Sequence, residues 1–272
     1  MTSFNCLTFL TDFGLEDGFV AACHGVALRI APSMPVIDIT HLVPPGDVRR
    51  GAAVLAQTVP AMPPAVHVAV VDPGVGTARR AIAVQAQGGI LVGPDNGLLS
   101  WAISALGGAV RAVLLTNDAL WNRPVSPTFH GRDIFMPVAA HLATGTDLAQ
   151  AGTEVDFGDL VMLATPMNRM LDGEAEGEVL SVDRFGNVQL SIPTSAAADL
   201  GIALGSTLII RCNRRELAAP YLETFGSAAP GDLIAFTDSA GLISLAVSNG
   251  NAAASLSLPP GARVRIAADL PA

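Results

Sequence analysis

The sequence predicts two domains, an N-terminal α/β domain with a Rossmann-like, mainly parallel sheet and an all-β C-terminal barrel domain. In the first part of the chain, short apolar runs alternate with longer segments of helical spacing, which is typical of strand–helix–strand units. Beyond residue 166 the runs become short and alternating, with Gly, Pro and Asn turns between them, as in a small barrel or sandwich. The length of 272 residues leaves room for two domains at about 150 residues each.

The N-terminal domain is expected to span residues 1–166. Its first half has three apolar runs that predict strands, with two segments of helical spacing between them. In chain order these are CLTFL, 18–30, PVIDIT, 48–57 and VHVAVV. The second half predicts two strands around the turn at Gly88 and Gly89, then a helix, a strand and a further helix. These are AIAVQA with GILVG, 98–106, AVLLT and 133–142.

Residues 166–173 are polar and flanked by Pro and Gly, so they are expected to form a linker. The C-terminal domain then spans residues 173–272. Its predicted strands lie in the runs EGEVLSVDRFGNVQLSI, TLIIRC, LIAFTD, LISLAV and ARVRIA.

Composition and charge exclude several classes of protein. Half of the residues are hydrophobic and 14% are charged, which is typical of a compact globular protein. The net charge of −9 and the 15 scattered basic residues argue against a nucleic-acid partner. The three cysteines form no CxxC pair, the N-terminus lacks a signal-peptide pattern, and no apolar run reaches the ~18 residues of a membrane span. We therefore expect a cytoplasmic protein with no membrane partner.

Three segments place polar residues at the ends of predicted strands, where open α/β sheets usually hold their catalytic groups. The first is LTDFGLEDG, in which Asp12 and Asp17 lie between a strand and a helix. One interpretation is that an Asp caps the helix. The other is that an Asp carboxylate accepts both hydroxyls of a ribose, as acidic residues do in dinucleotide sites.

The second segment is VVDPGVGTARR, where Asp72 ends the most hydrophobic strand and Arg79 follows a Pro-Gly-x-Gly turn. Such a turn lets backbone come close to a ligand. The alternative is an ordinary tight turn followed by solvated arginines. The segment matches neither GxxxxGK(S/T) nor GxGxxG, so it fits no standard phosphate loop.

The third segment is PTFHGRDIF, where Phe129 and His130 come just before a helix that Asp133 is expected to begin. A lone histidine is more often structural than catalytic. The five histidines show no HExxH or comparable ligand spacing, so no metal site is expected. The absence of GxSxG argues against a serine hydrolase.

Two turns of the β domain carry further polar residues. VDRFGNVQLSI contains Asp183, Phe185 and Asn187, and DSAGLISLAVSNGNAA contains Ser239 and Asn249. Alone, these segments indicate only turns. Phe185 and Asn187 nevertheless suit a purine, the first by stacking and the second through its amide donor and acceptor.

Taken in order, these motifs resemble one family over nearly the whole chain. The motifs are TDFG, DITH, VVDPGVGTARR, GPDNGLL, FHGRDIF, VDRFGNVQLSI and SNGNAA. The chain resembles the S-adenosyl-L-methionine hydrolases (adenosine-forming), or hydroxide adenosyltransferases, which are related to fluorinase and chlorinase. The resemblance implies an α/β domain, a β-barrel and a homotrimer with sites between subunits. It also implies that S-adenosyl-L-methionine is the substrate and that no cofactor is needed.

The resemblance assigns roles by motif. The family's catalytic trio falls on Asp72, Arg79 and His130. The substrate is assigned to eight further residues. These are Asp12 for the ribose, Asp17, Asp183 and Ser239 for the methionine, Phe185, Asn187 and Asn249 for the adenine, and Phe129 beside His130.

The sequence departs from the halogenases where they differ from hydrolases. Asp72 stands where the halogenases place an aromatic residue, and Gly131 replaces their halide-binding Ser. The halogenase-type insertion between the two strands after the Arg motif is missing. These departures favour water over halide, while Ala240, in place of an Arg, leaves the group that holds the substrate carboxylate open.

The predicted reaction is attack of water on the ribose C5′, giving adenosine and L-methionine. A sulfonium leaves as a neutral thioether, so the reaction needs an activated water but no general acid. Pairing with a cation makes a carboxylate a weaker base, so the sequence leaves the base open between Asp72 and His130. The alternatives are a halide-using relative, a non-catalytic protein that binds adenosyl ligands, and a metal-dependent nucleotide phosphohydrolase.

Overall fold

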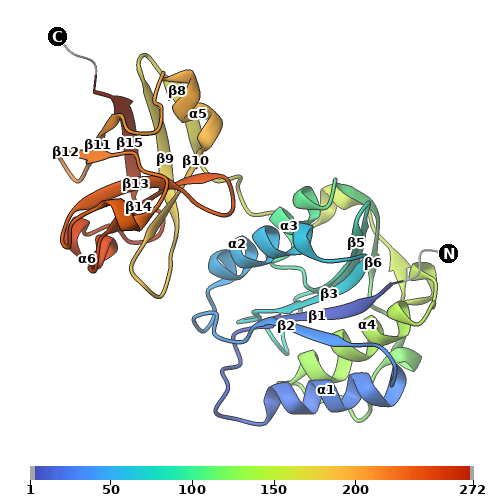
Figure 1. Ribbon diagram of the computed structural model, residues 1–272. Helices are drawn as coiled ribbons and strands as arrows, with labels where there is room; N and C mark the ends of the chain where they lie inside the picture. Colours follow the sequence, from blue (N-terminus) through green and yellow to red (C-terminus); the bar gives the residue numbers. More distant parts are fainter. Residues whose placement is uncertain (1–3, 270–272) are drawn as a thin grey trace. The chain divides into compact units, whose positions relative to one another are not determined.

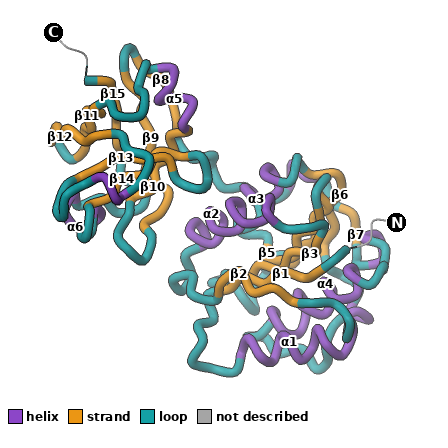
Figure 2. The backbone as a smooth tube through the Cα atoms, viewed as in Figure 1, coloured by secondary structure: helices purple, strands orange, loops and turns teal. Residues whose placement is uncertain are grey.

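The structure, a computed structural model, describes residues 4–269. The chain divides into two compact units, Met1–Ala164 and Thr165–Ala272 (Figure 1). The first unit combines helices with a sheet that contains parallel strands, and the second is an antiparallel, nearly closed barrel (Figure 2). The predicted fold class is therefore confirmed. Within residues 4–269, no helix is long and apolar enough to cross a membrane.

The first unit contains a seven-stranded sheet with the order β2-β1-β3-β5-β4-β6-β7. The strands β2, β1, β3 and β5 run parallel, and β4, β6 and β7 join them in antiparallel pairs. The bounds are β1 (Cys6–Thr11), β2 (Val36–Thr40), β3 (Ala65–Val70), β4 (Ala81–Ala86), β5 (Gly89–Pro94), β6 (Ala109–Leu114) and β7 (Thr153–Glu154).

Helices cover both faces of this sheet. Helices α1 and α4 pack on one face, and α2 and α3 pack on the other (Figure 1). The bounds are α1 (Phe19–Ile30), α2 (Val48–Thr58), α3 (Ser100–Ala105), the π-helical turn η3 (Gly131–Phe135) and α4 (Met136–Ala143). Short 3-10 turns are η1 (Val59–Ala61), η2 (Asp118–Leu120), η4 (Leu148–Gln150) and η5 (Phe157–Asp159).

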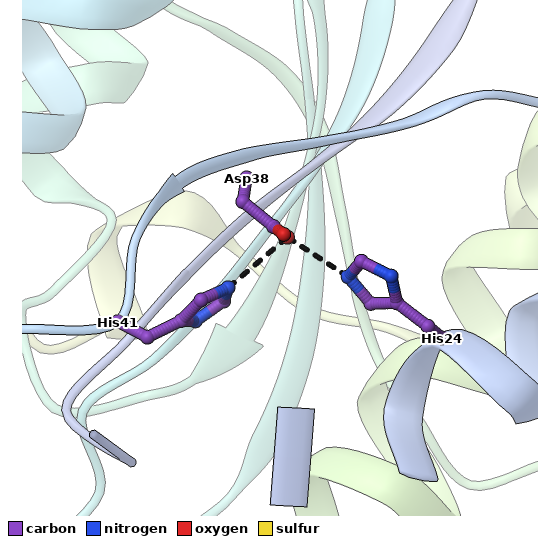
Figure 3. A group of neighbouring side chains, drawn as sticks. All are labelled: His24, Asp38 and His41. Atoms are coloured by element: carbon purple, nitrogen blue, oxygen red, sulfur yellow. Dashed lines mark hydrogen bonds and ion pairs between the residues drawn. The ribbon is translucent and has the colours of Figure 1, made fainter. Parts of the chain in front are cut away.

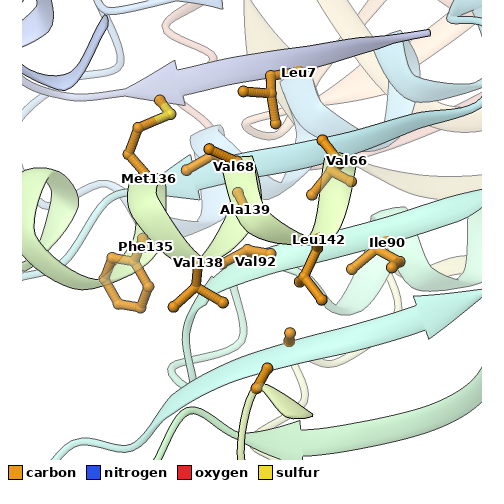
Figure 4. Close-up of a cluster of buried hydrophobic side chains, with 14 of the residues drawn as sticks. Leu7, Val66, Val68, Ile90, Val92, Phe135, Met136, Val138, Ala139 and Leu142 are labelled. Atoms are coloured by element: carbon orange, nitrogen blue, oxygen red, sulfur yellow. The ribbon is translucent and has the colours of Figure 1, made fainter. Parts of the chain in front are cut away.

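The core of the first unit explains why its strands are almost continuously apolar. Successive strand residues point to opposite faces, and here both faces are buried. Met136 and Val138 of the η3–α4 segment pack with Leu7 of β1 on one face (Figure 4). On the other face, Leu10 of β1 and Leu55 of α2 belong to a second cluster.

Two helix starts differ from the predictions. Helix α1 begins after Gly18, and no side chain of the described residues caps it, so the cap interpretation of Asp12 and Asp17 is wrong. Asp47, by contrast, caps α2 by accepting from the Arg50 N–H at 2.9 Å. The helix expected from residue 133 starts two residues earlier, as the π-helical turn Gly131–Phe135, and the Asp133 side chain does not cap it.

The second unit is built from eight antiparallel strands. Its order is β12-β11-β15-β9-β10-β14-β13, with β8 beside β9, and a bridge between Tyr221 and Ala235 brings the two ends close together. The bounds are β8 (Asn168–Leu171), β9 (Glu174–Val182), β10 (Val188–Pro193), β11 (Thr207–Cys212), β12 (Arg215–Pro220), β13 (Leu233–Thr237), β14 (Leu242–Val247) and β15 (Arg263–Ala268). Short helices are α5 (Thr194–Asp199), η6 (Phe225–Ser227) and α6 (Ala252–Leu256).

The expected linker at residues 166–173 is not a free connection. Residues 168–171 form β8, which pairs with β9 from Asn168 opposite Gly177 to Leu171 opposite Glu174. An ion pair between Arg169 of β8 and Glu176 of β9 supports this hairpin. The stretch therefore belongs to the barrel sheet.

Candidate active site

The ends of the parallel strands β1 and β3 place two predicted site residues at one edge of the sheet. Thr11 at the end of β1 is in register with Val70 at the end of β3. Asp12 follows Thr11 directly, and Asp72 lies two residues beyond Val70. Asp12 Oδ2 accepts a hydrogen bond from the Gly46 backbone N–H at 2.8 Å, which holds the carboxylate against the loop before α2.

Asp72, Arg79 and His130 form one hydrogen-bonded cluster. Arg79 donates from Nε and Nη2 to the two carboxylate oxygens of Asp72, at 3.1 and 2.5 Å. The same Nη2 lies 3.0 Å from His130 Nδ1. The side chains of Arg79 and Asp72 are only 8% and 4% exposed, so little water screens this ion pair. The structure thus brings together the three residues that were expected to be catalytic.

The arginine doublet is not solvated, so that alternative interpretation is wrong. Arg79 faces Asp72, and the Arg80 Nε donates to Asp95 Oδ2 at 2.7 Å. The two neighbouring arginines therefore hold two different carboxylates. A buried arginine needs such partners, because removing its charge from water is costly without them.

The hydrogen bond from Arg79 sets the state of the His130 ring. A guanidinium only donates, so His130 Nδ1 must accept and the neutral ring carries its proton on Nε2. Burial, and next the Arg79 charge, lower the pKa of His130 below its ordinary value, although Asp72 acts in the opposite direction. At neutral pH the ring is therefore neutral, with an occupied Nδ1 and an Nε2–H donor.

Gly76 allows the Asp72 turn to approach the loop that leads to His130. Its backbone has a φ of +76°, and a Cβ at this position would lie 2.5 Å from the Pro127 carbonyl oxygen. A side chain would therefore both strain the backbone and push the two loops apart. The close approach of these two loops therefore requires glycine at position 76, the second glycine of the DPGVGT motif.

Asp133 organises the loop from Asn122 to His130, a role that the sequence did not predict. Its fully buried carboxylate accepts from the Asn122 side chain at 2.7 Å and from the Ser126 N–H at 2.9 Å. Both oxygens also accept from Arg132, at 2.7 Å. Burial alone would raise the pKa of Asp133, but these hydrogen bonds lower it below its usual value.

An aromatic group lies beside His130. Phe129 contacts Phe13 and Phe19 edge to face, with centroid distances of 5.8 and 5.3 Å. A Cβ on Gly131 would lie 2.9 Å from the Phe13 ring, so the ring takes up the space of a side chain at this position. Phe129 is therefore part of the wall near the trio, whereas Asp17 is exposed.

In the second unit, Asp183, Phe185 and Asn187 share one tight turn between β9 and β10. Asp183 Oδ1 accepts from the backbone N–H groups of Phe185 and Asn187 at 2.8 and 2.9 Å, and its Oδ2 accepts from the Asn187 amide at 2.8 Å. The Phe185 ring is 69% exposed in this unit. The carboxylate thus holds the turn, and the turn presents the ring.

Asn249 and Ser239 lie at opposite ends of β14. The turn containing Asn249 is close to the Phe185 turn, because the Ala253 N–H donates to the Gly186 carbonyl at 3.0 Å. Ser239 lies in the β13–β14 turn, beside the far end of β10, where the Thr194 N–H donates to the Gly241 carbonyl. The structure therefore groups Asn249 with the Phe185 turn and separates Ser239 from it.

One cluster of possible metal ligands escaped the sequence analysis. His24 of α1, Asp38 of β2 and His41 just after β2 turn their side chains toward one another (Figure 3). Their ligand atoms all lie within 4.8 Å of one another. The DITH motif holds Asp38 and His41 at i and i+3, but only the packing of α1 against the sheet adds His24, so the complete cluster has no sequence signature.

The fold and site together define a class of two-domain proteins in which an α/β domain holds a buried Asp–Arg–His cluster at its strand ends and a barrel domain follows. Family models of the SAM hydroxide adenosyltransferase N-terminal and C-terminal domains match residues 7–152 and 177–265. The chain therefore belongs to the SAM hydroxide adenosyltransferase family, where SAM is S-adenosyl-L-methionine.

Individual relatives are similar to this chain over nearly its whole length. The chain is 55% identical over 268 residues to an (R)-S-adenosyl-L-methionine hydrolase of Salinispora arenicola, covering 98% of this chain and 100% of the relative. A fluorinase of Actinopolyspora mzabensis is more distant, at 27% identity over 96% of each chain. A crystal structure of a conserved Thermotoga maritima protein matches with a TM-score of 0.91 at 36% identity, covering 96% of this chain and 99% of that one.

Proposed function

We propose that this protein hydrolyses (R)-S-adenosyl-L-methionine at the ribose C5′, giving adenosine and L-methionine. The single observation that carries the proposal is the buried Asp72–Arg79–His130 cluster at the strand ends. Full-length similarity to a hydrolase named for this substrate supports it. The (R) form is included because the name of that relative specifies it.

The trio prepares water for attack. The oxygen of water forms a bond to C5′ while the C5′–S bond breaks, and sulfur keeps the electron pair as it becomes a neutral thioether. One proton must leave the water. Asp72 takes this role, because each of its oxygens keeps an acceptor site beside the bond from Arg79, whereas His130 Nδ1 is already occupied. His130 contributes its Nε2–H, which orients the water.

The remaining site residues bind the substrate. Asp12 accepts the ribose hydroxyls, and Phe129 closes the site beside His130. Phe185, Asn187 and Asn249 hold the adenine, while Asp17, Asp183 and Ser239 hold the methionine. The shared Phe185 turn and its neighbouring Asn249 support one adenine site, and the separate position of Ser239 supports a different end of an extended ligand, with Asp183 of the Phe185 turn lying between adenine and methionine.

The proposal includes a homotrimer in which neighbouring subunits complete each site. The exposed Phe185 ring supports it, since a ring that binds adenine needs a covering surface. Light scattering of the purified protein should give three times the chain mass. Mixing Asp72→Asn chains with Phe185→Ala chains, under conditions of subunit exchange, should create some sites with both native substrate affinity and native turnover, which neither variant has alone. A fully active monomer would overturn the trimer.

Water is favoured over halide by the same geometry. Phe13 fills the space of a side chain at Gly131, where the halogenases carry their halide-binding Ser. The charged Asp72 also disfavours an anion beside it. Reaction in ¹⁸O-labelled water should therefore place the label on the 5′-hydroxyl of adenosine, and 5′-halo-adenosine as the main product in moderate chloride would reassign the enzyme.

The deciding experiment is incubation of purified protein with each sulfonium epimer of S-adenosyl-L-methionine in the presence of EDTA. Chromatography should show adenosine and methionine from the (R) epimer. Bound but unchanged ligand would indicate a binding protein instead. Turnover of nucleotides that requires an added divalent ion would indicate a phosphohydrolase.

A further inference from the structure

A second polar cluster lies next to the Asp12 loop and shares no residue with the proposed active site. His24 Nε2 lies 2.8 Å from Asp38 Oδ1, and His41 Nε2 lies 3.0 Å from the same oxygen (Figure 3). The three side chains come from α1, from β2 and from the residue that follows β2. Two imidazole nitrogens and one carboxylate oxygen thus converge on one point.

His41 supplies an independent indication that a ligand belongs at this point. The residue is 3% exposed, and its Nε2, although near Asp38, has no aligned hydrogen-bond partner among the described residues. An unsatisfied buried nitrogen is costly and rare. The other ring nitrogen, Nδ1, is held by the Thr11 hydroxyl at 2.9 Å, which fixes the ring with Nε2 facing the cluster.

We propose that His24, Asp38 and His41 bind one divalent transition-metal ion, with zinc as the best match. Two histidines and one carboxylate, with water in the remaining position, form a common zinc ligand set. Donor–ion distances of about 2.0–2.2 Å place tetrahedral ligand atoms roughly 3.3–3.6 Å apart, so the two histidine nitrogens, now 2.8 and 3.0 Å from Asp38 Oδ1, need to move away from it by only roughly 0.3–0.8 Å to admit the ion. Thr11 is the outer partner that orients His41, as metal-binding histidines usually have.

The ion has a structural role. His24, Asp38 and His41 are separate from Asp72, Arg79 and His130, so the metal takes no part in the chemistry. It joins α1 to β2 and, through His41 and Thr11, fixes the residue next to Asp12. The Gly14 N–H also donates to the His41 carbonyl at 2.8 Å, which ties the same loop to this site. Metal binding is therefore expected to stabilise the first unit and the ribose-binding loop.

Calorimetric titration of chelator-treated protein with Zn²⁺ tests the proposal without requiring any turnover. We expect one equivalent per chain and a higher melting temperature. Asp38→Asn and His24→Gln should each weaken binding at least about a hundredfold, and Thr11→Val should weaken it about ten- to a hundredfold, the usual effect of losing an outer partner. The control is His141→Gln, a partly buried histidine outside the cluster, which should bind zinc like the native protein.

Co²⁺ gives a second measurement that needs no variant. Its visible absorption should show a low-coordinate site with nitrogen and oxygen ligands, and Zn²⁺ should remove that absorption. The proposal is overturned if no equivalent of zinc or cobalt binds at micromolar concentration, or if folded cluster variants bind as tightly as the His141 control. The three residues would then be only an imidazole–carboxylate network.

Discussion

The two units present their polar residues in opposite ways. In the first unit, Asp72 and Arg79 are buried and held by each other and by His130 before any substrate arrives. In the second unit, Asp183 uses its carboxylate to hold its own turn, and Phe185 is exposed. The proposed catalytic trio is therefore preorganised within one unit, whereas the proposed adenine-binding surface is left for a ligand or a neighbouring chain to cover.

Energetics explain this difference. A buried ion pair recovers the cost of leaving water only when its partners are fixed and its remaining positions are hydrogen-bonded. Exposed turns have no such desolvation cost, so their side chains need no fixed partner before the ligand binds. Loss of a member of the buried trio should thus lower the rate of the reaction, and loss of the exposed turn in the second unit should weaken binding alone.

The largest effect is expected for the trio. Asp72→Asn, Arg79→Ala and His130→Ala should each lower turnover by roughly a hundred- to ten-thousand-fold, the range for acid–base groups. Affinity for S-adenosyl-L-methionine should stay within about tenfold, or 1.4 kcal/mol. Double variants should lose little more than single ones, because the residues act on one water as a unit. Single-turnover kinetics with separate binding measurements check this.

Arg80→Ala is the matched control, since it breaks the neighbouring Arg80–Asp95 pair and leaves the trio intact. It should lower the melting temperature while the folded enzyme keeps normal turnover. If Asp72→Asn behaves like Arg80→Ala, the Asp72–Arg79 pair is only structural.

A smaller effect is expected for Asp12, the proposed ribose-binding residue, whose carboxylate accepts from the Gly46 N–H. Asp12→Ala should weaken the binding of substrate and of adenosine alike, by roughly 1.5–3 kcal/mol for each lost hydrogen bond to a ribose hydroxyl. Asp12→Asn, which keeps an acceptor for the Gly46 N–H, should fall between the native protein and Asp12→Ala. Calorimetry with adenosine measures this, and unchanged affinity in a folded Asp12→Ala protein contradicts the ribose assignment.

Most of the fold could be predicted because burial on both faces leaves long apolar runs, as in β1 and β3. The missed elements include the short strand β7, the short helices α5 and α6, and two hairpin strands with charged residues. Strand β8 lies in the expected linker, where Asp172-Gly173 is a typical two-residue hairpin turn. Strand β12 follows a turn in which Asn213 and Arg214 have positive φ without any glycine, so no turn signal marks it.

The site was predictable only where motifs carry it. Asp72, Arg79 and His130 lie in segments with strand-end and turn signals, but only the family resemblance of these motifs joined the three into one predicted trio. The loop held by Asp133 and the approach of His24 to the Asp38–His41 pair of the DITH motif depend on loop and helix packing that no local pattern encodes. His24 and Asp38, for example, are 14 residues apart and belong to different element types.

Acid should lower the stability of the first unit more than that of the second. All five histidines lie in the first unit, and burial lowers the pKa of His67 to about 4. The unfolded chain binds this proton below about pH 6.5 while the folded unit does not, so stability is unchanged above pH 6.5 and falls as the pH drops toward 4. The loss from His67 alone approaches about 3 kcal/mol.

Two intrinsic probes distinguish the units, because both tryptophans, Trp101 and Trp121, lie in the first and the single tyrosine, Tyr221, lies in the second. Denaturant titrations should show the tryptophan signal weakening with acid more than the tyrosine signal. His67→Gln should flatten that dependence. Equal slopes for both probes would remove the proposed difference in acid sensitivity.

The smallest effect is expected for Phe185, and it decides whether the exposed turn is a binding surface. Phe185→Ala should weaken adenosine binding by about 0.5–1.5 kcal/mol, the range for aromatic stacking. Turnover at saturating substrate should stay nearly unchanged. The isolated unit loses little stability, since the ring is 69% exposed there. Arg184→Ala is the control, because the Arg184 guanidinium lies 5.8 Å from the ring and its removal leaves the ring in place.

If Phe185→Ala binds adenosine like the native protein, the second unit holds no adenine site. If it instead lowers turnover as strongly as Asp72→Asn, the preorganised chemistry extends beyond the first unit, and the contrast between the two units fails.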